Sequence, residues 1–330
     1  MSTQNQLSRW GAISRTSPEL APGSKLFLVS DSDDTTVGPS NLGAEFPVDN
    51  DGVVRVYTTI QAAVNAAAAG RGDVVAVLPG YDQSLTAADS WATAGVQVIG
   101  FGNGNNRPTL RYTGASGEVG LSANNIRVSN LRFLAAVDSC ARALDMDTGF
   151  SGQRLDNCVF DYNATGNDFR VMVRMGAQRS VIEDNRFLSE DTAGTGKGVS
   201  IKGGAPIYGV VRNNYFVGQF DTVGDTSDGA AAIAQDTSDT ADTNFTGFLV
   251  QKNTIVSTDT AVGAAIRFSA GYQKRGLVSE NRIVSYDSAG SDTVLLALAG
   301  MHFSGNWVSR QDTTEKLAGE TAVKVTDSGN

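Results

Sequence analysis

Seven eight-residue segments of this 330-residue chain follow one pattern, in which the third and the eighth residues are always apolar. The final residues of successive segments lie 27, 27, 29, 39, 28 and 25 positions apart. A pattern that returns at such intervals is typical of a repeat architecture, in which each unit stacks on the next. The segments are IRVSNLRF (126–133), QRLDNCVF (153–160), SVIEDNRF (180–187), GVVRNNYF (209–216), FLVQKNTI (248–255), GLVSENRI (276–283) and MHFSGNWV (301–308).

A bend is required within each segment. A strand points successive side chains to opposite faces, so two residues five positions apart on a straight strand cannot both face the interior. The polar residues between the two apolar positions are rich in asparagine, which tolerates the left-handed backbone conformation that a bend needs. One asparagine recurs at the same place in five consecutive segments, and a cysteine occupies that place one segment earlier: Asn185, Asn214, Asn253, Asn281, Asn306 and Cys158.

Residues that share a pattern position lie above one another when the units stack. The recurring asparagines should therefore form a ladder of amides, each bonded to its neighbours above and below. The phenylalanines at the last position should form a stacked aromatic column in the interior. These phenylalanines are Phe133, Phe160, Phe187 and Phe216.

A second apolar strand is expected between each pair of segments. Two to three short strands in each 25–30 residues, with no helix between them, describe one coil of a β-solenoid. At about 4.8 Å per coil, nine or ten coils give a rod of about 45 Å. The expected strands are 143–147, 171–175, 198–202, 231–235, 264–268 and 294–299, with 322–325 closing the last coil.

The stretch 57–82 reads as a helix followed by a buried strand. Thr58 or Thr59 is a plausible N-cap, the alanine run favours helix, and Gly70 is the expected stop. The following strand is expected from Val74 to Leu78. A short helix at this place can cover the open end of a solenoid.

Two motifs in this stretch carry a resemblance to a known family. The sequences TIQAAVNAA (59–67) and GDVVAVLPGY (72–81) resemble the N-terminal cap of the pectate-lyase-like superfamily, and the Asn-bearing segments resemble its coils. The resemblance covers roughly residues 53–326. It implies an all-β fold, a single-stranded right-handed parallel β-helix with a short N-terminal capping helix. It does not specify a function, because this fold serves lyases, hydrolases, tailspikes and non-enzymatic virion proteins.

Residues 1–50 fall outside the repeat and are predicted to be an N-terminal arm, with the β-helix domain at 51–330. A single strand is expected within LFLVSDSDD (26–34). The opening QLSRWGAISRTSPELAPGSKLFLVSDSDD (6–34) resembles the leader of β-helical structural proteins of tailed phages. That resemblance implies a virion protein, a homotrimer, and contact with a major capsid protein. The arm could reach a neighbouring subunit or fold over the rod's own N-terminal end.

Charge and cysteine content exclude several classes of function. The formal charge is −9, and no cluster of Lys or Arg offers a basic face, so neither nucleic acid nor a membrane surface is expected as a partner. Cys140 and Cys158 are the only cysteines and are expected to be reduced and buried. The N-terminus has no apolar stretch of a secretory signal, so synthesis in a host cytoplasm is expected.

The strongest catalytic candidates are Asp156 and Glu183, which share a pattern position in adjacent coils, with Arg212 in the next. Carboxyl groups about 5–5.5 Å apart suit a retaining glycosidase. The preferred interpretation is an exposed charge ladder without catalytic function. The remaining acidic and histidine candidates are interpreted as turn or surface residues, with His302 facing outwards: Asp145, Asp147, Glu190, Asp191 and His302.

The sequence therefore predicts no catalytic, cofactor-binding or metal-binding residues. The Asp/Thr/Ser-rich stretch 221–244 lacks calcium-binding spacing, and neither GTGKG (194–198) nor GFGNGN (100–105) matches a phosphate-binding loop. The favoured function is a non-enzymatic capsid decoration or cement protein on a phage head. The alternative is a tailspike-like protein that binds or cleaves polysaccharide as a glycosidase or lyase, near outward Tyr215 and Trp307. A cellular pectin-type lyase is the least favoured of the three.

Overall fold

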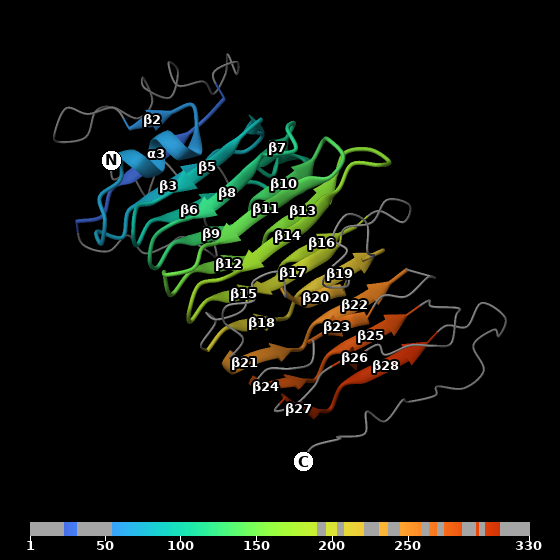
Figure 1. Ribbon diagram of the computed structural model, residues 1–330. Coiled ribbons are helices and arrows are strands. Elements are labelled where there is room, and N and C mark those ends of the chain that lie inside the picture. The colour runs from blue at the N-terminus through green and yellow to red at the C-terminus, as the bar shows by residue number, and fades with distance from the viewer. Residues whose placement is uncertain are drawn as a thin grey trace.

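The chain forms three parallel sheets that wind around one apolar core (Figure 1). The computed structural model describes residues 23–31, 55–189, 196–202, 208–220, 231–236, 245–258, 264–268, 274–285, 295–296 and 301–310. Each coil gives one strand to sheet A, then one to sheet B, then one to sheet C, and the next coil lies directly beside it. Parallel crossovers of this kind are right-handed. The predicted right-handed parallel β-helix is confirmed.

The strands of each sheet follow in spatial order. Sheet A contains β2 (Val56–Tyr57), β1 (Leu26–Val29), β3 (Val74–Val77), β6 (Gln97–Gly100), β9 (Arg127–Ser129), β12 (Arg154–Asp156), β15 (Val181–Glu183), β18 (Val210–Arg212), β21 (Phe245–Gln251), β24 (Lys274–Ser279) and β27 (Met301–Ser304). Sheet B contains β4 (Asp82–Leu85), β7 (Thr109–Tyr112), β10 (Arg132–Ala135), β13 (Val159–Tyr162), β16 (Arg186–Leu188), β19 (Tyr215–Gly218), β22 (Thr254–Ser257), β25 (Arg282–Ser285) and β28 (Trp307–Arg310). Sheet C contains β5 (Ala88–Trp91), β8 (Glu118–Leu121), β11 (Cys140–Met146), β14 (Phe169–Met175), β17 (Lys197–Lys202), β20 (Ala231–Asp236), β23 (Ala264–Arg267) and β26 (Leu295–Leu296).

The predicted repeat segments are the corners between sheets A and B. Leu155 on β12 of sheet A and Phe160 on β13 of sheet B are both fully buried, and the chain turns between them at Asn157, whose φ is 53°. The left-handed residue of each corner is the one before the ladder position, and not the ladder asparagine itself. The left-handed residues in successive coils are Asn130, Asn157, Asp184, Asn213, Lys252, Glu280 and Gly305. The sequence reasoning had merged these two roles.

The asparagine ladder is confirmed. The Asn185 Nδ2 atom donates to the Asn214 Oδ1 atom at 3.0 Å, and the same bond joins Asn214 to Asn253 and Asn253 to Asn281. The last rung joins Asn281 to Asn306 at 2.9 Å. Each Oδ1 atom also accepts from a backbone N–H of the coil before it, so the ladder ties backbone to backbone through the corner.

The phenylalanine column is confirmed as well. The rings of Phe133, Phe160, Phe187 and Phe216 stack with centroids 4.5 to 4.8 Å apart and with planes within 8° of parallel. Ile255 and Ile283 continue the column in the next two coils, in register with Phe216. Strand spacing in the sheet sets the ring spacing, because each ring follows the strand that carries it.

The N-terminal cap differs from the prediction at one end. Helix α3 spans Ile60–Ala66, with Thr59 as N-cap, as expected. It ends before Gly70, because the chain is already extended at Ala67 and the N–H of Ala68 bonds to the buried carboxylate of Asp73 at 2.8 Å. Asp73 also accepts from the backbone N–H of Lys25 at 2.7 Å, which fixes the approach to β1. No helix of the described residues is long and apolar enough to span a membrane.

Strand β1 lies between β2 and β3 at the N-terminal edge of sheet A. This part of the predicted arm therefore folds against the rod's own end. The division at residue 50 stays a prediction. The expected strand at 322–325, Glu190, Asp191 and most of the 221–244 stretch lie outside the described residues.

Candidate functional site

Asp156 and Glu183 stand side by side on the outer face of sheet A, in register on β12 and β15. The sequence predicted an exposed charge ladder at these positions. The prediction that the carboxylates are exposed was wrong. Asp156 is 7% exposed and Glu183 is 2% exposed. The long side chains of neighbouring arginines lie over both carboxylates and remove them from water.

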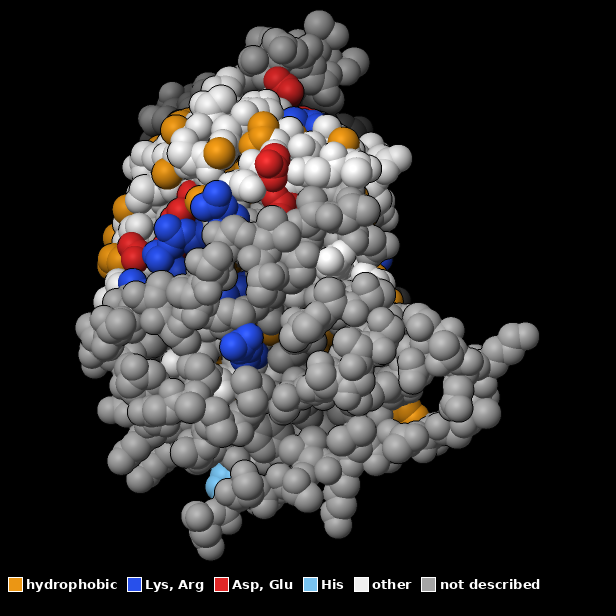
Figure 2. Space-filling view, turned by 45° about the vertical axis from the view of Figure 1, so that its right-hand side comes forward, with side chains coloured by type: hydrophobic (Ala, Val, Ile, Leu, Met, Phe, Trp, Pro, Cys, Tyr) orange, Lys and Arg blue, Asp and Glu red, His pale blue; other side chains and the backbone are white. Residues whose placement is uncertain are grey.

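Three arginines hold these two carboxylates. Arg127 donates to both Asp156 oxygens, from Nε at 2.7 Å and from Nη2 at 2.8 Å. Arg212 donates from Nε to Glu183 Oε2 at 2.7 Å, and Arg154 lies between the two acids, in contact with each. The result is a continuous ion-pair ladder, Arg127–Asp156–Arg154–Glu183–Arg212, across four coils. Figure 2 shows basic and acidic side chains next to one another on the described surface.

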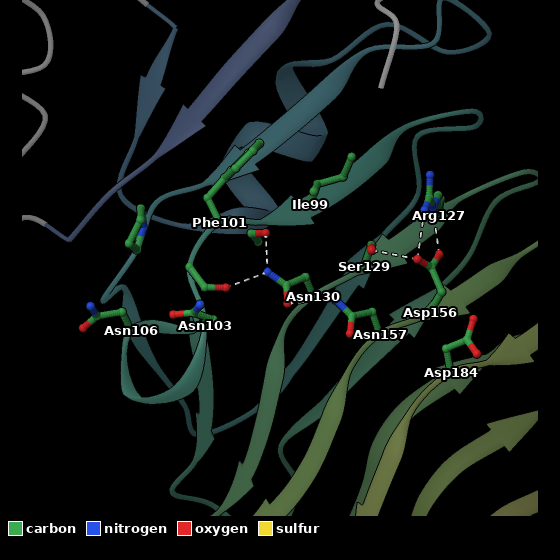
Figure 3. A pocket seen from close by; sticks show the side chains of 13 residues that line it. Ile99, Phe101, Asn103, Asn106, Arg127, Ser129, Asn130, Asp156, Asn157 and Asp184 are labelled. Carbon is green, nitrogen blue, oxygen red and sulfur yellow. Dashed lines mark hydrogen bonds and ion pairs between the residues drawn. The ribbon is translucent and has the colours of Figure 1, made fainter. Parts of the chain in front are cut away.

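A cleft of about 730 Å³ opens beside the N-terminal end of this ladder (Figure 3). Arg127, Ser129 and Asp156 lie on one side, Asn103 and Asn106 on the other, and Asn130 between them. Asn157 and Asp184 extend the same side along the corner between sheets A and B. Amide, hydroxyl and guanidinium groups thus converge on a space beside a small apolar wall formed by Pro79, Ile99 and Phe101.

The far wall of the cleft is the loop between β6 and β7, with the short 3-10 helix η2 (Gly104–Asn106). The Asn130 Nδ2 atom donates to the backbone oxygens of Gly100 at 2.7 Å and Gly102 at 3.0 Å, which holds the loop to the rod. Gly102 has a φ of 115°, and a Cβ there would lie 2.3 Å from the Asn106 oxygen. The sequence reasoning missed this wall. The length of this loop could have revealed it. Eight residues (101–108) separate β6 from β7, whereas only two residues (130–131) separate β9 from β10 in the next coil.

A second carboxyl pair lies at the turn between sheets B and C. Asp168 is 4% exposed and accepts the backbone N–H of Ser139 at 2.7 Å, while the Ser139 hydroxyl donates to Asp138 at 2.9 Å. Burial, and then the charge of Asp138, raise the pKa of Asp168 to about 6. Sequence reasoning missed this pair, although aligning the second strands would have placed Ser139 beside Asp168, since Cys140 pairs with Phe169.

Asp168→Asn should stabilise the protein at neutral pH. The pKa of Asp168 is raised on folding, so its favourable contribution exists at low pH and is lost as pH rises through about 6. Asparagine keeps an oxygen for the Ser139 N–H and removes the charge. We expect a gain of about 1–2 kcal/mol in the free energy of unfolding at pH 7.5, reduced by solvent screening, and almost none at pH 4.

Denaturant unfolding at both pH values checks this expectation. Asp138→Asn is the matched control, because it removes the neighbouring charge from an exposed side chain and leaves the Asp168 carboxyl in place. Asp138→Asn should raise the free energy of unfolding at pH 7.5 by less than Asp168→Asn does. Equal effects of Asp168→Asn at pH 4 and pH 7.5 would contradict the assignment.

The prediction that Asp145 is a turn or surface residue is wrong. It is a strand residue of β11 and only 4% exposed, and not a turn residue. Arg174 donates from Nε to Asp145 Oδ1 at 2.9 Å, and Arg142 bridges Asp145 and Glu118. Burial raises the pKa of Glu118, against the lowering effect of Arg142. Here again arginines connect carboxylates of neighbouring coils.

The remaining candidates are dispersed. His302 is exposed on β27, as expected, and Asp147 is partly buried just after β11. Cys140 and Cys158 are free and buried, as predicted, and burial raises their pKa values to about 11 and about 12. Among the described residues, no group of three or more His, Cys, Asp or Glu side chains could hold a metal ion. Tyr215 and Trp307 lie on sheet B, so they do not share the face of Asp156 and Glu183.

Comparisons with known proteins add little to this geometry. No family model and no curated protein matches the chain. Among solved structures, the Agl-KA catalytic domain is 17% identical over 76% of this chain and 50% of its own, with a TM-score of 0.45. ORF18 of Geobacillus virus E2 is 10% identical over 78% of this chain and 58% of its own, with a TM-score of 0.42. The tailspike of E. coli bacteriophage HK620, solved with a pentasaccharide, is 15% identical over 81% of this chain and 62% of its own, with a TM-score of 0.41.

This chain therefore spans between half and about three fifths of the length of these three structures. Identities and TM-scores this low give no basis for transferring an activity, a ligand or a partner. The fold rests on the strand pairing of the chain itself, and the function must be argued from its own side chains.

Proposed function

We propose that this chain is a non-enzymatic structural protein of a tailed-phage virion, acting as a decoration or cement protein on the capsid surface. The observation that carries the proposal is the ion-pair ladder on sheet A. The two carboxylates best placed for chemistry, Asp156 and Glu183, have their oxygens engaged by Arg127, Arg154 and Arg212. A nucleophile or proton donor has to present such an oxygen to a substrate. Here these groups tie successive coils together.

The interior supports the same role. The amide ladder runs without interruption through five coils, and the phenylalanine column runs through four. Each connects successive coils along the rod axis over the part of the rod that it spans, which suits a protein that must resist bending or peeling. The leader at 6–34, with its resemblance to structural proteins of tailed phages, supplies the virion assignment. The expected partners are the major capsid protein and two further copies of the chain.

Particle fractionation tests the proposal. Particles are purified from a host that carries this gene, and the chain is quantified per capsid by mass spectrometry. Tens to hundreds of copies, in constant ratio to the major capsid protein, are expected. Asp156→Asn and Glu183→Gln variants that fold should be incorporated at the wild-type ratio. Absence of the chain from the particles would refute the proposal, and a few copies per particle would move it to the tail.

The cleft favours a second candidate function, a tailspike-like protein that binds or cleaves polysaccharide. Its volume lies within the range of small-molecule sites, and its amide and guanidinium groups can bond to sugar hydroxyls. Isothermal titration with oligosaccharides of the host surface decides this alternative, with Asn103→Ala as the variant that removes a cleft amide. Release of reducing ends, lost in Asp156→Asn, would identify a glycosidase. New unsaturated ends would identify a lyase.

A further inference from the structure

A row of arginine and aromatic side chains runs along the outer face of sheet B. Its members occupy one register position in successive coils, and we name them the arginine–aromatic column: Arg186, Tyr215, Thr254, Arg282 and Trp307. Tyr215 is 39% exposed and Trp307 is 48% exposed, so two large aromatic rings face solvent. The Arg186 guanidinium lies 6.0 Å from the centre of the Tyr215 ring.

An apolar row lies beside this column, two residues further along each strand. Its members are half-buried and are in register with one another: Leu188, Val217, Val256 and Val284. Sheet B therefore presents branched aliphatic side chains next to arginine, tyrosine and tryptophan on one parallel sheet. Tyr, Trp and Arg are the residue types that dominate binding energy in protein interfaces.

The arginines of this face differ in their pairing. Towards the N-terminal end of sheet B, Arg111 is paired with Asp82 and Arg132 with Asp161. Within the described part of the chain, no carboxylate lies within ion-pair distance of Arg186 or Arg282. These two cations lie three coils apart, or about 14 Å. They stand out in a chain whose formal charge is −9.

We propose that the outer face of sheet B, centred on the arginine–aromatic column, docks an acidic protein surface of the particle. This inference rests on the proposed virion function and names the face that makes the contact. The unpaired guanidinium groups of Arg186 and Arg282 select carboxylates on the partner. The aliphatic row selects a protein over a polysaccharide, because it offers apolar area where a glycan needs hydroxyl partners. The acidic remainder of the chain repels the same partner, which fixes the orientation.

The test uses particles that lack the chain through deletion of its gene, to which purified full-length protein is added. Bound copies per particle are measured by mass spectrometry across a concentration series. A double variant, Arg186→Gln with Arg282→Gln, and a second, Tyr215→Thr with Trp307→Thr, should each bind at least tenfold more weakly. Arg179→Gln, which removes an exposed arginine at the turn between β14 and β15, is the matched control and should bind as wild type. Circular dichroism melting confirms that all variants fold.

The outcomes separate the inference from the function on which it rests. If wild-type protein does not bind the particles, both fail. If wild type and both double variants bind equally, the docking face is elsewhere, and only the inference is overturned. Binding that periodate treatment of the particles abolishes would identify a glycan partner and overturn the choice of a protein. If the variants lose self-association but bind particles as wild type does, the face makes contacts between copies of the chain. That result would also overturn the inference.

Discussion

Replacing Asn253 by leucine should lower the free energy of unfolding by about 4 kcal/mol, although the two side chains have similar size. Asn253 is fully buried in the middle of the ladder. Its Oδ1 atom accepts from the backbone N–H and the Nδ2 atom of Asn214, both at 3.0 Å, and its Nδ2 atom donates to the Val211 oxygen at 3.0 Å. Leucine removes the partner of the Asn214 N–H and of this Val211 bond, and it leaves the Asn214 Nδ2 atom with only its bond to the Ile182 oxygen at 2.9 Å. Each buried group that loses a bond costs about 1–3 kcal/mol. The added apolar contact offsets part of that loss.

Asn306→Leu provides the graded control. Asn306 makes the same kinds of bond but is only partly buried at the end of the described ladder. Water can reach the groups it leaves, so the loss should stay below about 1.5 kcal/mol. Urea unfolding of the three proteins measures both differences. No loss at Asn253 would show that the ladder bonds do not stabilise the corner, and equal losses at the two positions would contradict the dependence on burial.

The ladder could be predicted because its members recur at one position of the repeat, and such a recurrence is visible in the sequence alone. Two details needed the structure. The residue that turns the chain is the one before each rung, and Lys252 and Glu280 fill that position as readily as Asn130 does, with φ values near 56°. Composition therefore did not distinguish the bending residue from the bonding residue, since asparagine serves both.

The burial of Asp156 and Glu183 could not be read from the sequence for another reason. Both residues occupy outward-facing positions on their strands. Because side chains alternate between the two faces of a strand, such positions are expected to be exposed to solvent. Their burial comes from contacts with Arg127 and Arg212 on neighbouring coils and with Arg154, which lies on the same strand as Asp156. The cleft beside them depends likewise on how one glycine-rich loop folds back onto Asn130, 28 residues away from Gly102. Contacts of that kind are set by side-chain direction, and the repeat pattern fixes only backbone register.

Phe187→Ala should cost about 4 kcal/mol in the free energy of unfolding. The ring is fully buried and is stacked between Phe160 at 4.8 Å and Phe216 at 4.5 Å. Alanine leaves a cavity in a core that a rigid stack of coils cannot collapse to fill, and truncation of a buried phenylalanine costs about 3–5 kcal/mol. Both neighbouring rings also lose a stacked partner.

Phe187→Ile is the matched control, because the chain itself places isoleucine at this position in Ile255 and Ile283. It fills most of the space and should cost less than about 2 kcal/mol. Denaturant unfolding gives both values, and hydrogen exchange of β13, β16 and β19 tests their origin. If the column couples the coils, Phe187→Ala should accelerate exchange in all three of these strands, while Phe187→Ile should leave β13 and β19 protected. Acceleration confined to β16 would mean that each coil holds its own phenylalanine independently, and the column would then contribute burial without stiffness.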